Sequence, residues 1–269
     1  MSASSHCTPK SADLPRNLNC VSSNDGGAVN LGESPKGTGV FITFEGCEGC
    51  GKTEQSKQLY AWLNEEFPEI NVVRTREPGG SHGAEQIRSL LLTGEVSSWL
   101  PQSELLLFYA ARYDHWVHTI LPVLEKGGIV VCDRFFDSSN AYQGWGHGLP
   151  EKYFVWLDQL LNDENSGHPC VPDITYVLCI DPAVGLKRSQ ARLQAGRSLG
   201  NETEDRFERI DVDFHKRVQA GYEHILKNNP DRCVRVDASR SIEEIHRDIV
   251  EDVKKKVSRQ GYKPSHKKS

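Results

Sequence analysis

Residues 46–53, GCEGCGKT, carry side chains whose spacing suits two different chemistries. Cys47 and Cys50 form a C-x-x-C, the spacing of redox cysteine pairs and of zinc knuckles. The same eight residues match G-x-x-x-x-G-K-[ST], the pattern of a phosphate-binding loop. A zinc site needs a second ligand pair at comparable spacing, and the other cysteines form no second C-x-x-C. The pattern therefore favours phosphate binding and leaves a thiol function as the alternative.

Each part of a phosphate-binding loop has a physical role. Glycines let backbone N–H groups converge on a phosphate, and the N-terminus of the following helix adds its positive dipole. Lys52 brings charge to the β and γ phosphates of ATP, and Thr53 offers a hydroxyl to Mg²⁺. The predicted ATP-binding residues are Gly46, Cys47, Glu48, Gly49, Cys50, Gly51, Lys52 and Thr53. The chain has no N-K-x-D guanine motif, which argues against a GTPase.

A second group of chemically active side chains lies in CDRFFDSSNAYQG at 132–144. Asp133 stands where a carboxylate at a strand end can hold Mg²⁺ or its waters. Arg134 follows it and can bridge the phosphates of donor and acceptor. Three further side chains can read a base and a sugar: Ser139, Asn140 and Tyr142. A purely structural Asp–Arg pair is the alternative.

Two more segments offer groups that bind a substrate. TREPGGS at 75–81 is expected at a strand's carboxyl end, where open α/β sheets bind ligands, and supplies Arg76 and Pro78. An ordinary turn with a surface ion pair is its alternative. In ELLLFYAARYDHW, Phe108 and Arg112 are four residues apart and share a helical face. The ring can stack on a base while the guanidinium grips a phosphate, unless Phe108 is core and Arg112 pairs with an acid.

The segment LKRSQARLQAGRSLGNETEDRFER at 186–209 is polar and has no acidic residue before Glu202. Arg188 and Arg192 stand at helical spacing, and Arg197 comes further along. We expect a mobile lid whose arginines meet phosphate charge when it closes. A solvated, charged helix would show the same composition.

Apolar runs bounded by glycine and proline predict strands, with helical patterns between them. Strands alternating with helices imply an α/β fold: one doubly wound, five-stranded parallel sheet with helices on both faces. Residues 1–38 show no periodicity and predict a disordered extension, and 258–269 predict a basic tail. The expected strands are 39–46, 71–77, 127–134, 172–181 and 232–238, and the expected helices are 51–67, 83–93, 102–126, 150–161, one from 182, and 241–256.

Composition excludes several classes of protein. Hydrophobic residues make up 37% of the chain, enough for one core, and no apolar run is long enough to span a membrane. No secretory signal is expected, so the eight cysteines should remain thiols in a reducing, cytoplasmic compartment, and an organelle transit peptide in the Ser-rich N-terminus is the alternative. The net charge of −5 argues against a nucleic-acid partner.

Across residues 39–257 the chain closely resembles the thymidylate kinase family. The resemblance rests on FITFEGCEGCGKT, TREPGG, FYAAR, DRFFDSSNAYQG and DRFE, in the order of the family. It implies a P-loop kinase fold, a homodimer, and ATP-dependent phosphorylation of dTMP to dTDP by Mg²⁺-assisted in-line transfer. A kinase for another nucleoside monophosphate and a non-catalytic nucleotide-binding regulator are the alternatives.

The same resemblance implies roles for individual residues. Glu48 matches an acidic loop residue near the acceptor phosphate and the 3′-hydroxyl, and Arg112 and Arg134 match phosphate-binding arginines. Phe108 matches the ring that stacks on thymine. Tyr142 matches the aromatic that crowds the 2′ position of the sugar, and Ser139 and Asn140 fall where base contacts occur. The implied catalytic set is Glu48, Lys52, Arg134, Arg192 and Arg197, with Thr53 and Asp133 at the metal.

The chain departs from the family pattern in two places that concern the lid. No arginine precedes Lys52 in the phosphate loop, which is the bacterial arrangement, in which a lid arginine supplies the charge. The lid also carries the insertion LQAGRSLGNETE before DRFE. The choice among the lid arginines therefore stays open, with Arg192 favoured and Arg197 next.

Overall fold

The structure is a computed structural model that describes residues 39–162, 168–198, 204–259 and 261–262. Side chains are described for these residues except 196–198. All of them belong to the second of two units into which the chain divides, Met1–Ser34 and Pro35–Ser269. The predicted extension 1–38 and most of the predicted tail 258–269 lie outside the described residues.

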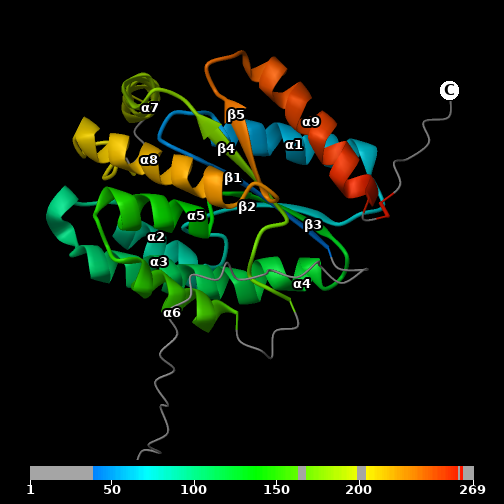
Figure 1. The fold of residues 1–269 in the computed structure, drawn as a ribbon, viewed down its shortest axis with the longest axis horizontal. Coiled ribbons are helices and arrows are strands. Elements are labelled where there is room, and N and C mark those ends of the chain that lie inside the picture. The colour runs from blue at the N-terminus through cyan, green and yellow to red at the C-terminus, as the bar shows by residue number, and fades with distance from the viewer. Residues whose placement is uncertain (1–38, 163–167, 199–203, 260, 263–269) are drawn as a thin grey trace, which may run out of the picture. The chain divides into compact units, whose positions relative to one another are not determined.

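The strands form one parallel sheet in the order β2-β3-β1-β4-β5 (Figure 1). This confirms the predicted fold class, and each strand lies where the sequence predicts it. The central strand β1 is buried at every residue, because a sheet covered on both faces offers no solvated side. The strand bounds are Val40–Gly46 for β1, Val72–Arg76 for β2, Ile129–Asp133 for β3, Ile174–Cys179 for β4 and Cys233–Asp237 for β5.

Helices cover both faces of the sheet (Figure 1). Alternate residues of β1 point to opposite faces: Ile42 packs with α1 and α9, and Phe41 packs with α3 and α4. Helix α8 completes the second face over β4. The bounds are Lys52–Glu66 for α1, His82–Leu92 for α2, Pro101–His115 for α3, Leu121–Leu124 for α4, Phe136–Ser139 for α5, Glu151–Leu161 for α6, Pro182–Ser198 for α7, Val212–Asn228 for α8 and Ile242–Arg259 for α9.

The helix predicted at 102–126 is interrupted. A π-helical turn, η2 at Trp116–Ile120, separates α3 from α4. Pro122, at the start of α4, has no N–H to donate to the carbonyl of His118, so a regular α-helical bond is missing there. The wider π turn accommodates this loss.

Three helical regions of the described residues lie outside the predicted elements. The shortest is a 3₁₀ turn, η1 at Val96–Ser98. Residues 136–146 form α5 and a second π-helical turn, η3 at Asn140–Gly146. The third is α8, which begins at a regular N-cap where Asp211 Oδ1 accepts from the backbone of Phe214 at 2.8 Å. A buried apolar residue recurs every four positions in α8: Phe214, Val218 and Tyr222. The cap and the spacing were both visible in the sequence.

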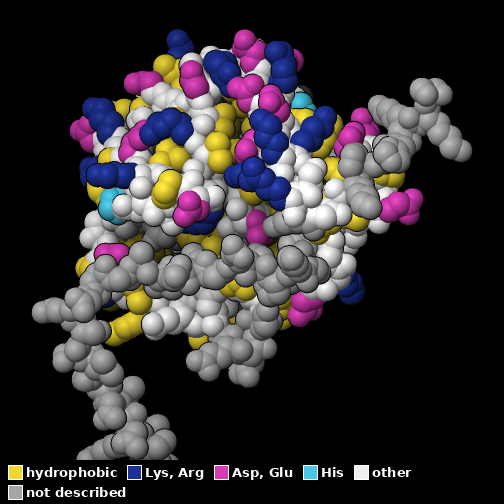
Figure 2. Space-filling view, turned by 45° about the vertical axis from the view of Figure 1, so that its right-hand side comes forward, with side chains coloured by type: hydrophobic (Ala, Val, Ile, Leu, Met, Phe, Trp, Pro, Cys, Tyr) yellow, Lys and Arg dark blue, Asp and Glu magenta, His cyan; other side chains and the backbone are white. Residues whose placement is uncertain are grey.

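Helix α9 shows how the outer surface is built. Its exposed side holds ion pairs one turn apart, Glu251 with Lys255 and Asp252 with Lys256. Figure 2 shows basic and acidic side chains interspersed over the upper part of the visible face. No helix in the described part of the chain is long and apolar enough to span a membrane.

Candidate active site

A cleft of about 840 Å³ opens where the strands of the sheet end in loops. Most of the predicted site residues line it: Glu48, Gly49, Gly51, Lys52, Thr53, Arg76, Pro78, Phe108, Arg112, Asp133, Arg134, Ser139, Tyr142 and Arg192. Gly46, Cys47, Cys50 and Asn140 are not among its lining residues. The side chain of Arg197 lies outside the described residues.

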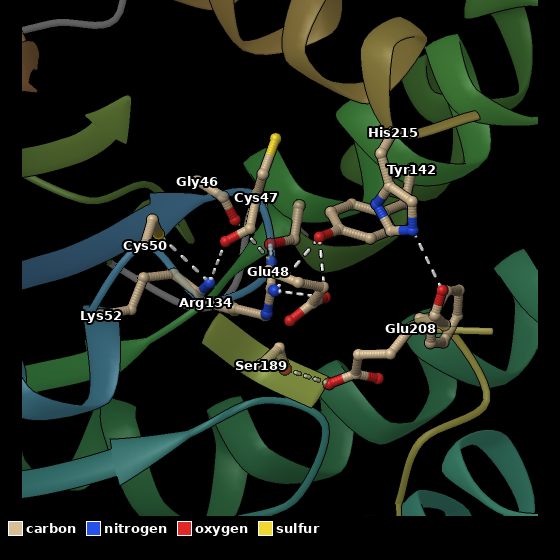
Figure 3. Close-up of polar contacts among 12 residues, drawn as sticks. Gly46, Cys47, Glu48, Cys50, Lys52, Arg134, Tyr142, Ser189, Glu208 and His215 are labelled. Atoms are coloured by element: carbon tan, nitrogen blue, oxygen red, sulfur yellow. Dashed lines mark hydrogen bonds and ion pairs between the residues drawn. The ribbon is translucent and has the colours of Figure 1, made fainter. Parts of the chain in front are cut away.

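The phosphate loop runs from the end of β1 into α1 and closes around its own lysine. Lys52 Nζ donates to the carbonyl of Cys47 at 2.8 Å, which holds the ammonium inside the turn (Figure 3). Gly49 and Gly51 have φ values of 66° and 98°, so the loop needs residues without a Cβ there. At Gly49 a side chain would also meet the Gly185 carbonyl of α7, with its Cβ 2.0 Å away. The first turn of α7, the lid helix, is thus packed against the phosphate loop.

The two loop cysteines do not act as a pair in this structure. Cys47 packs into the core under α8, whereas Cys50 packs into the core under α1, and Figure 3 shows their side chains pointing different ways. Burial raises the pKa of the Cys47 thiol to about 12, so it stays protonated. All six cysteines in the described ranges are free thiols. These positions support the phosphate-loop interpretation over the thiol alternative.

Thr53 and Asp133 meet at the end of the sheet. Because β1 and β3 are neighbours in register, the start of α1 lies beside the end of β3, and Thr53 Oγ1 donates to Asp133 Oδ2 at 2.5 Å. A hydroxyl and a carboxylate beside a phosphate loop suit Mg²⁺, which prefers oxygen ligands and takes most of them from water and phosphates. The donor set therefore fits the metal that the sequence predicts.

Arg134 is held on all sides. It is the one residue other than glycine with a positive φ, 72°, among the described residues, a conformation that costs about 1–3 kcal/mol. Its guanidinium, largely buried, donates to five oxygens: Gly46 O, Ser138 Oγ, Glu48 Oε1 and the hydroxyls of Tyr142 and Tyr222. Figure 3 shows several of these contacts converging on it. The strained backbone is fixed by this network, so the cation is preorganised.

Glu48 carries the opposite charge at the same place. One oxygen, Oε1, accepts from Arg134 Nη2 at 2.7 Å and from the Tyr142 hydroxyl at 2.8 Å. Burial alone would raise the pKa of Glu48, but Arg134 and then Lys52 outweigh it and lower the pKa to about 2. Glu48 is therefore ionised at neutral pH and fixes both partners.

Arg112 is a different kind of arginine. Its Nε donates to Glu77 Oε2 at 2.8 Å and its Nη2 donates to Ser139 Oγ at 2.9 Å, while Nη1 is buried without a partner. The predicted alternative of an acid partner is thus realised, although the guanidinium still lines the cleft beside Phe108. Because Glu77 balances its charge, Arg112 presents the cleft with a guanidinium of fixed orientation more than with a net cation.

Arg76 and Pro78 sit at the rim of the cleft. Arg76 pairs with Glu85 at 3.0 Å, and about half of its side chain is exposed. The carbonyl of Pro78 accepts from Arg88 Nη1 at 2.6 Å. Arg76 is therefore free to exchange a solvated carboxylate for a ligand, whereas the Pro78 turn is tied down.

The lid arginines differ in placement. Arg192 faces the cleft from α7, with 63% of its side chain exposed, and its nearest partners are Ser189 Oγ at 3.1 Å and Glu208 Oε1 at 3.8 Å. Arg188 instead donates to the carbonyl of Ala238 at 3.2 Å, at the end of β5. The insertion residues 199–203 lie outside the described residues.

Sequence reasoning quoted DRFE without assigning a role to its residues. Phe207 and Glu208 line the cleft, and the Phe207 ring lies 6.1 Å from Phe108 and 5.6 Å from Tyr142. Arg206 anchors the motif, since it is buried against Glu104 at 2.5 Å. The motif DRFE itself was the signal in the sequence that could have identified these residues as part of the site.

A cleft with a phosphate loop on one side and fixed arginines and aromatic rings on the other defines a P-loop kinase of small molecules. Residues 44–249 match the family described as thymidylate kinase. The thymidylate kinase of Caulobacter vibrioides is 42% identical over 207 residues, covering 77% of this chain and 92% of that protein. That of Halalkalibacterium halodurans is 40% identical over 220 residues, covering 82% and 98%. The chain therefore belongs to the thymidylate kinase family.

A solved structure also supports membership of the thymidylate kinase family. The crystal structure of thymidylate kinase from Ehrlichia chaffeensis matches with a TM-score of 0.63 and 33% sequence identity. The match covers 80% of this chain and 99% of that one. Fold, site and sequence thus agree on a nucleoside monophosphate kinase.

Proposed function

We propose that this chain transfers the γ-phosphoryl group of ATP to dTMP, giving dTDP. The observation that carries the proposal is that the phosphate loop shares one cleft with a pocket of aromatic rings and buried arginines. Family membership supplies the nucleotide. A non-catalytic regulator would not need the preorganised cation at Arg134.

The chemistry asks the protein for alignment and charge, and little covalent work. The loop amides and Lys52 hold the ATP phosphates. Arg134, beside the loop, faces the point where the donor and acceptor phosphates must meet and neutralises charge there. The exposed Arg192 then closes over the transferring group from α7.

The other end of the cleft selects the nucleotide. Phe108 and Phe207 offer faces and edges to a flat base, and the Arg112 guanidinium lines the cleft beside them. Ser139 braces that arginine. Tyr142 stands between the base region and Glu48, where its ring limits the space beside the sugar.

Magnesium would be held by Thr53 Oγ1 and Asp133, and would supply charge neutralisation to the ATP phosphates. The groups of three or more His, Cys, Asp or Glu that hold a metal by protein alone are absent from the described residues. A site of one hydroxyl and one carboxylate agrees with a metal that arrives with the nucleotide.

Two further proposals concern the setting of the enzyme. Exposed apolar side chains recur along one face of α3 and η2, at Leu106, Tyr113 and Val117, with Leu90 of α2 also exposed. A second copy of this chain would cover that stripe and give a homodimer, which the molar mass from light scattering would test. The free thiols of the described cysteines suit a reducing, cytoplasmic compartment.

Replacing Lys52 tests the phosphate loop. Lys52→Ala should lower kcat for dTMP by about a hundredfold or more, because a preorganised cation is removed from the transferring group. Cys50→Ala is the matched control in the same loop and should stay within about threefold of the wild type. The reverse pattern would restore the thiol alternative. Activity measured on dTMP, dUMP, UMP and CMP would settle the acceptor.

A further inference from the structure

His115, the last residue of α3, is wholly buried and lies at the centre of the TREPGG turn. Its Nε2 is 2.7 Å from Thr75 Oγ1, and its Nδ1 is 3.1 Å from Glu77 Oε1. Gly80 closes over the same ring, since a Cβ there would stand 2.3 Å from His115 Nε2. Three residues of one motif therefore contact a single side chain of another element.

The hydrogen bonds continue from His115 to the cleft. Glu77 uses one oxygen for His115 and the other, Oε2, for Arg112 Nε at 2.8 Å. Arg112 in turn reaches the cleft wall, with its Nη1 buried and unpartnered. His115 itself is not among the lining residues. Any effect of His115 on a bound nucleotide must therefore pass through its neighbours, of which Glu77 and Arg112 line the cleft.

We propose that His115 is a positioning residue for the acceptor nucleotide: it fixes the Glu77 carboxylate, which holds the Arg112 guanidinium in one direction at the cleft wall. The inference rests on the proposed function, in which the cleft around Arg112 takes the acceptor. The Glu77 carboxylate can only accept, which places the proton of the neutral ring on Nδ1, and Nε2 then accepts from the Thr75 hydroxyl. Without that donor, the carboxylate can turn and the guanidinium loses its fixed direction.

Four variants of the full chain separate this role from simple packing. His115→Leu removes both ring nitrogens, His115→Asn keeps a donor near the position of Nδ1, and Thr75→Val removes only the hydroxyl. His118→Leu is the matched control, because His118 lies three residues on in η2 and 65% of its side chain is exposed. Each variant is checked for folding by thermal unfolding.

The first readout is steady-state kinetics. His115→Leu should raise KM for dTMP about tenfold and leave KM for ATP unchanged, since a buried bond to a charged group is lost on the acceptor side alone. His115→Asn should recover most of that loss, Thr75→Val should show about a threefold rise, and His118→Leu should match the wild type. Equal rises for both substrates, or no rescue by Asn, would overturn the positioning role.

The second readout does not depend on activity. In ¹⁵N NMR spectra without nucleotide, the Arg112 Nε–H signal should be protected from exchange in the wild type and in His115→Asn, and exposed in His115→Leu. An unchanged signal in His115→Leu overturns the inference even if dTMP turnover is normal. A wild-type chain that does not phosphorylate dTMP refutes the proposed function instead, and the signal still decides whether His115 orders Arg112. If His115→Leu does not fold, Thr75→Val carries both readouts.

Discussion

Arg134 and Arg192 face the same cleft but are held in opposite ways. Arg134 is mostly buried, sits on a strained backbone and donates to five oxygens. Arg192 is mostly exposed and has two loose partners on α7 and the DRFE segment. The difference separates a charge that is in place before substrates arrive from one that must be brought to them.

The lid helix combines both properties along its length. Near its start, Gly185 is packed so closely on the phosphate loop that a Cβ would stand 2.3 Å from the Glu48 carbonyl. Further on, the side chains of α7 become exposed. A helix fixed at its base and loose beyond it can swing Arg192 over the cleft without disturbing the loop.

Removing the fixed cation should have the largest effect. Arg134→Ala should lower kcat about a thousandfold, because it removes preorganised donors at the reacting phosphates and leaves Glu48 without its partner. Arg134→Lys should recover little, since a single ammonium cannot reach acceptors on several sides. Steady-state kinetics with ATP and dTMP measure both. If Lys restored near-normal turnover, Arg134 would act as a simple charge and the comparison would fail.

Removing Arg192, the cation that must be brought to the substrates, should lower kcat less than removing Arg134. Arg192→Ala should lower kcat and kcat/KM together by about a hundredfold and leave KM for ATP nearly unchanged, because the guanidinium engages only as the transition state forms. Arg188→Ala is the matched control on the same helix, since Arg188 is bound to Ala238, and it should stay near wild type. A larger loss in Arg197→Ala than in Arg192→Ala would transfer the role to Arg197.

Tyr142, one of the side chains that hold Arg134, tests how the site excludes a ribose. Tyr142→Ala should raise the relative kcat/KM for the ribose analogue of dTMP about tenfold, since the exclusion of a 2′-hydroxyl by the ring is steric. Tyr142→Phe keeps the ring and should preserve the discrimination, although it loses the hydrogen bond to Glu48. A ratio that stays constant in the Ala variant would make Tyr142 a core residue only, packed on Phe207 and Phe214.

The sequence predicted the strands and the loop because their signals are local. The apolar runs of β1 and β3 and the spacing of the phosphate loop need no information from distant residues. It gave an acid partner for Arg112 only as an alternative and did not name Glu77, and it did not predict that Tyr222 of α8 would help hold Arg134. Those contacts depend on which helices meet at the end of the sheet, and a spacing rule carries no such information.

Replacing Glu45 should have the smallest effect on turnover, and it tests how the residues that hold Arg134 are stabilised. This carboxyl lies wholly inside, where Oε1 accepts from the backbone of Phe135 and Oε2 accepts from the hydroxyls of Ser138 and Tyr222. Ser138 and Tyr222 both bind Arg134 as well. Burial first and the nearby Asp137 second raise the pKa of Glu45 to about 7, well above its ordinary value of 4.5.

The sign of the pH effect follows from that shift. Between pH 4.5 and 7 the folded chain keeps a proton on Glu45 that the unfolded chain has lost, so this residue makes the free energy of unfolding fall as pH rises. Glu45→Gln cannot ionise, and its stability relative to wild type should therefore increase across that window by roughly 2–3 kcal/mol. Urea unfolding at pH 5 and pH 8 measures it, with Glu151→Gln at an exposed site of α6 as the control.

The effect of Glu45→Gln on turnover should be small. Because the hydroxyls of Ser138 and Tyr222 can accept from the new amide instead of donating to the carboxylate, kcat should change by only about threefold. If the free energy of unfolding depends on pH in the same way for Glu45→Gln and wild type, Glu45 is already ionised in the folded state. The network around Arg134 would then hold one more buried charge than we infer.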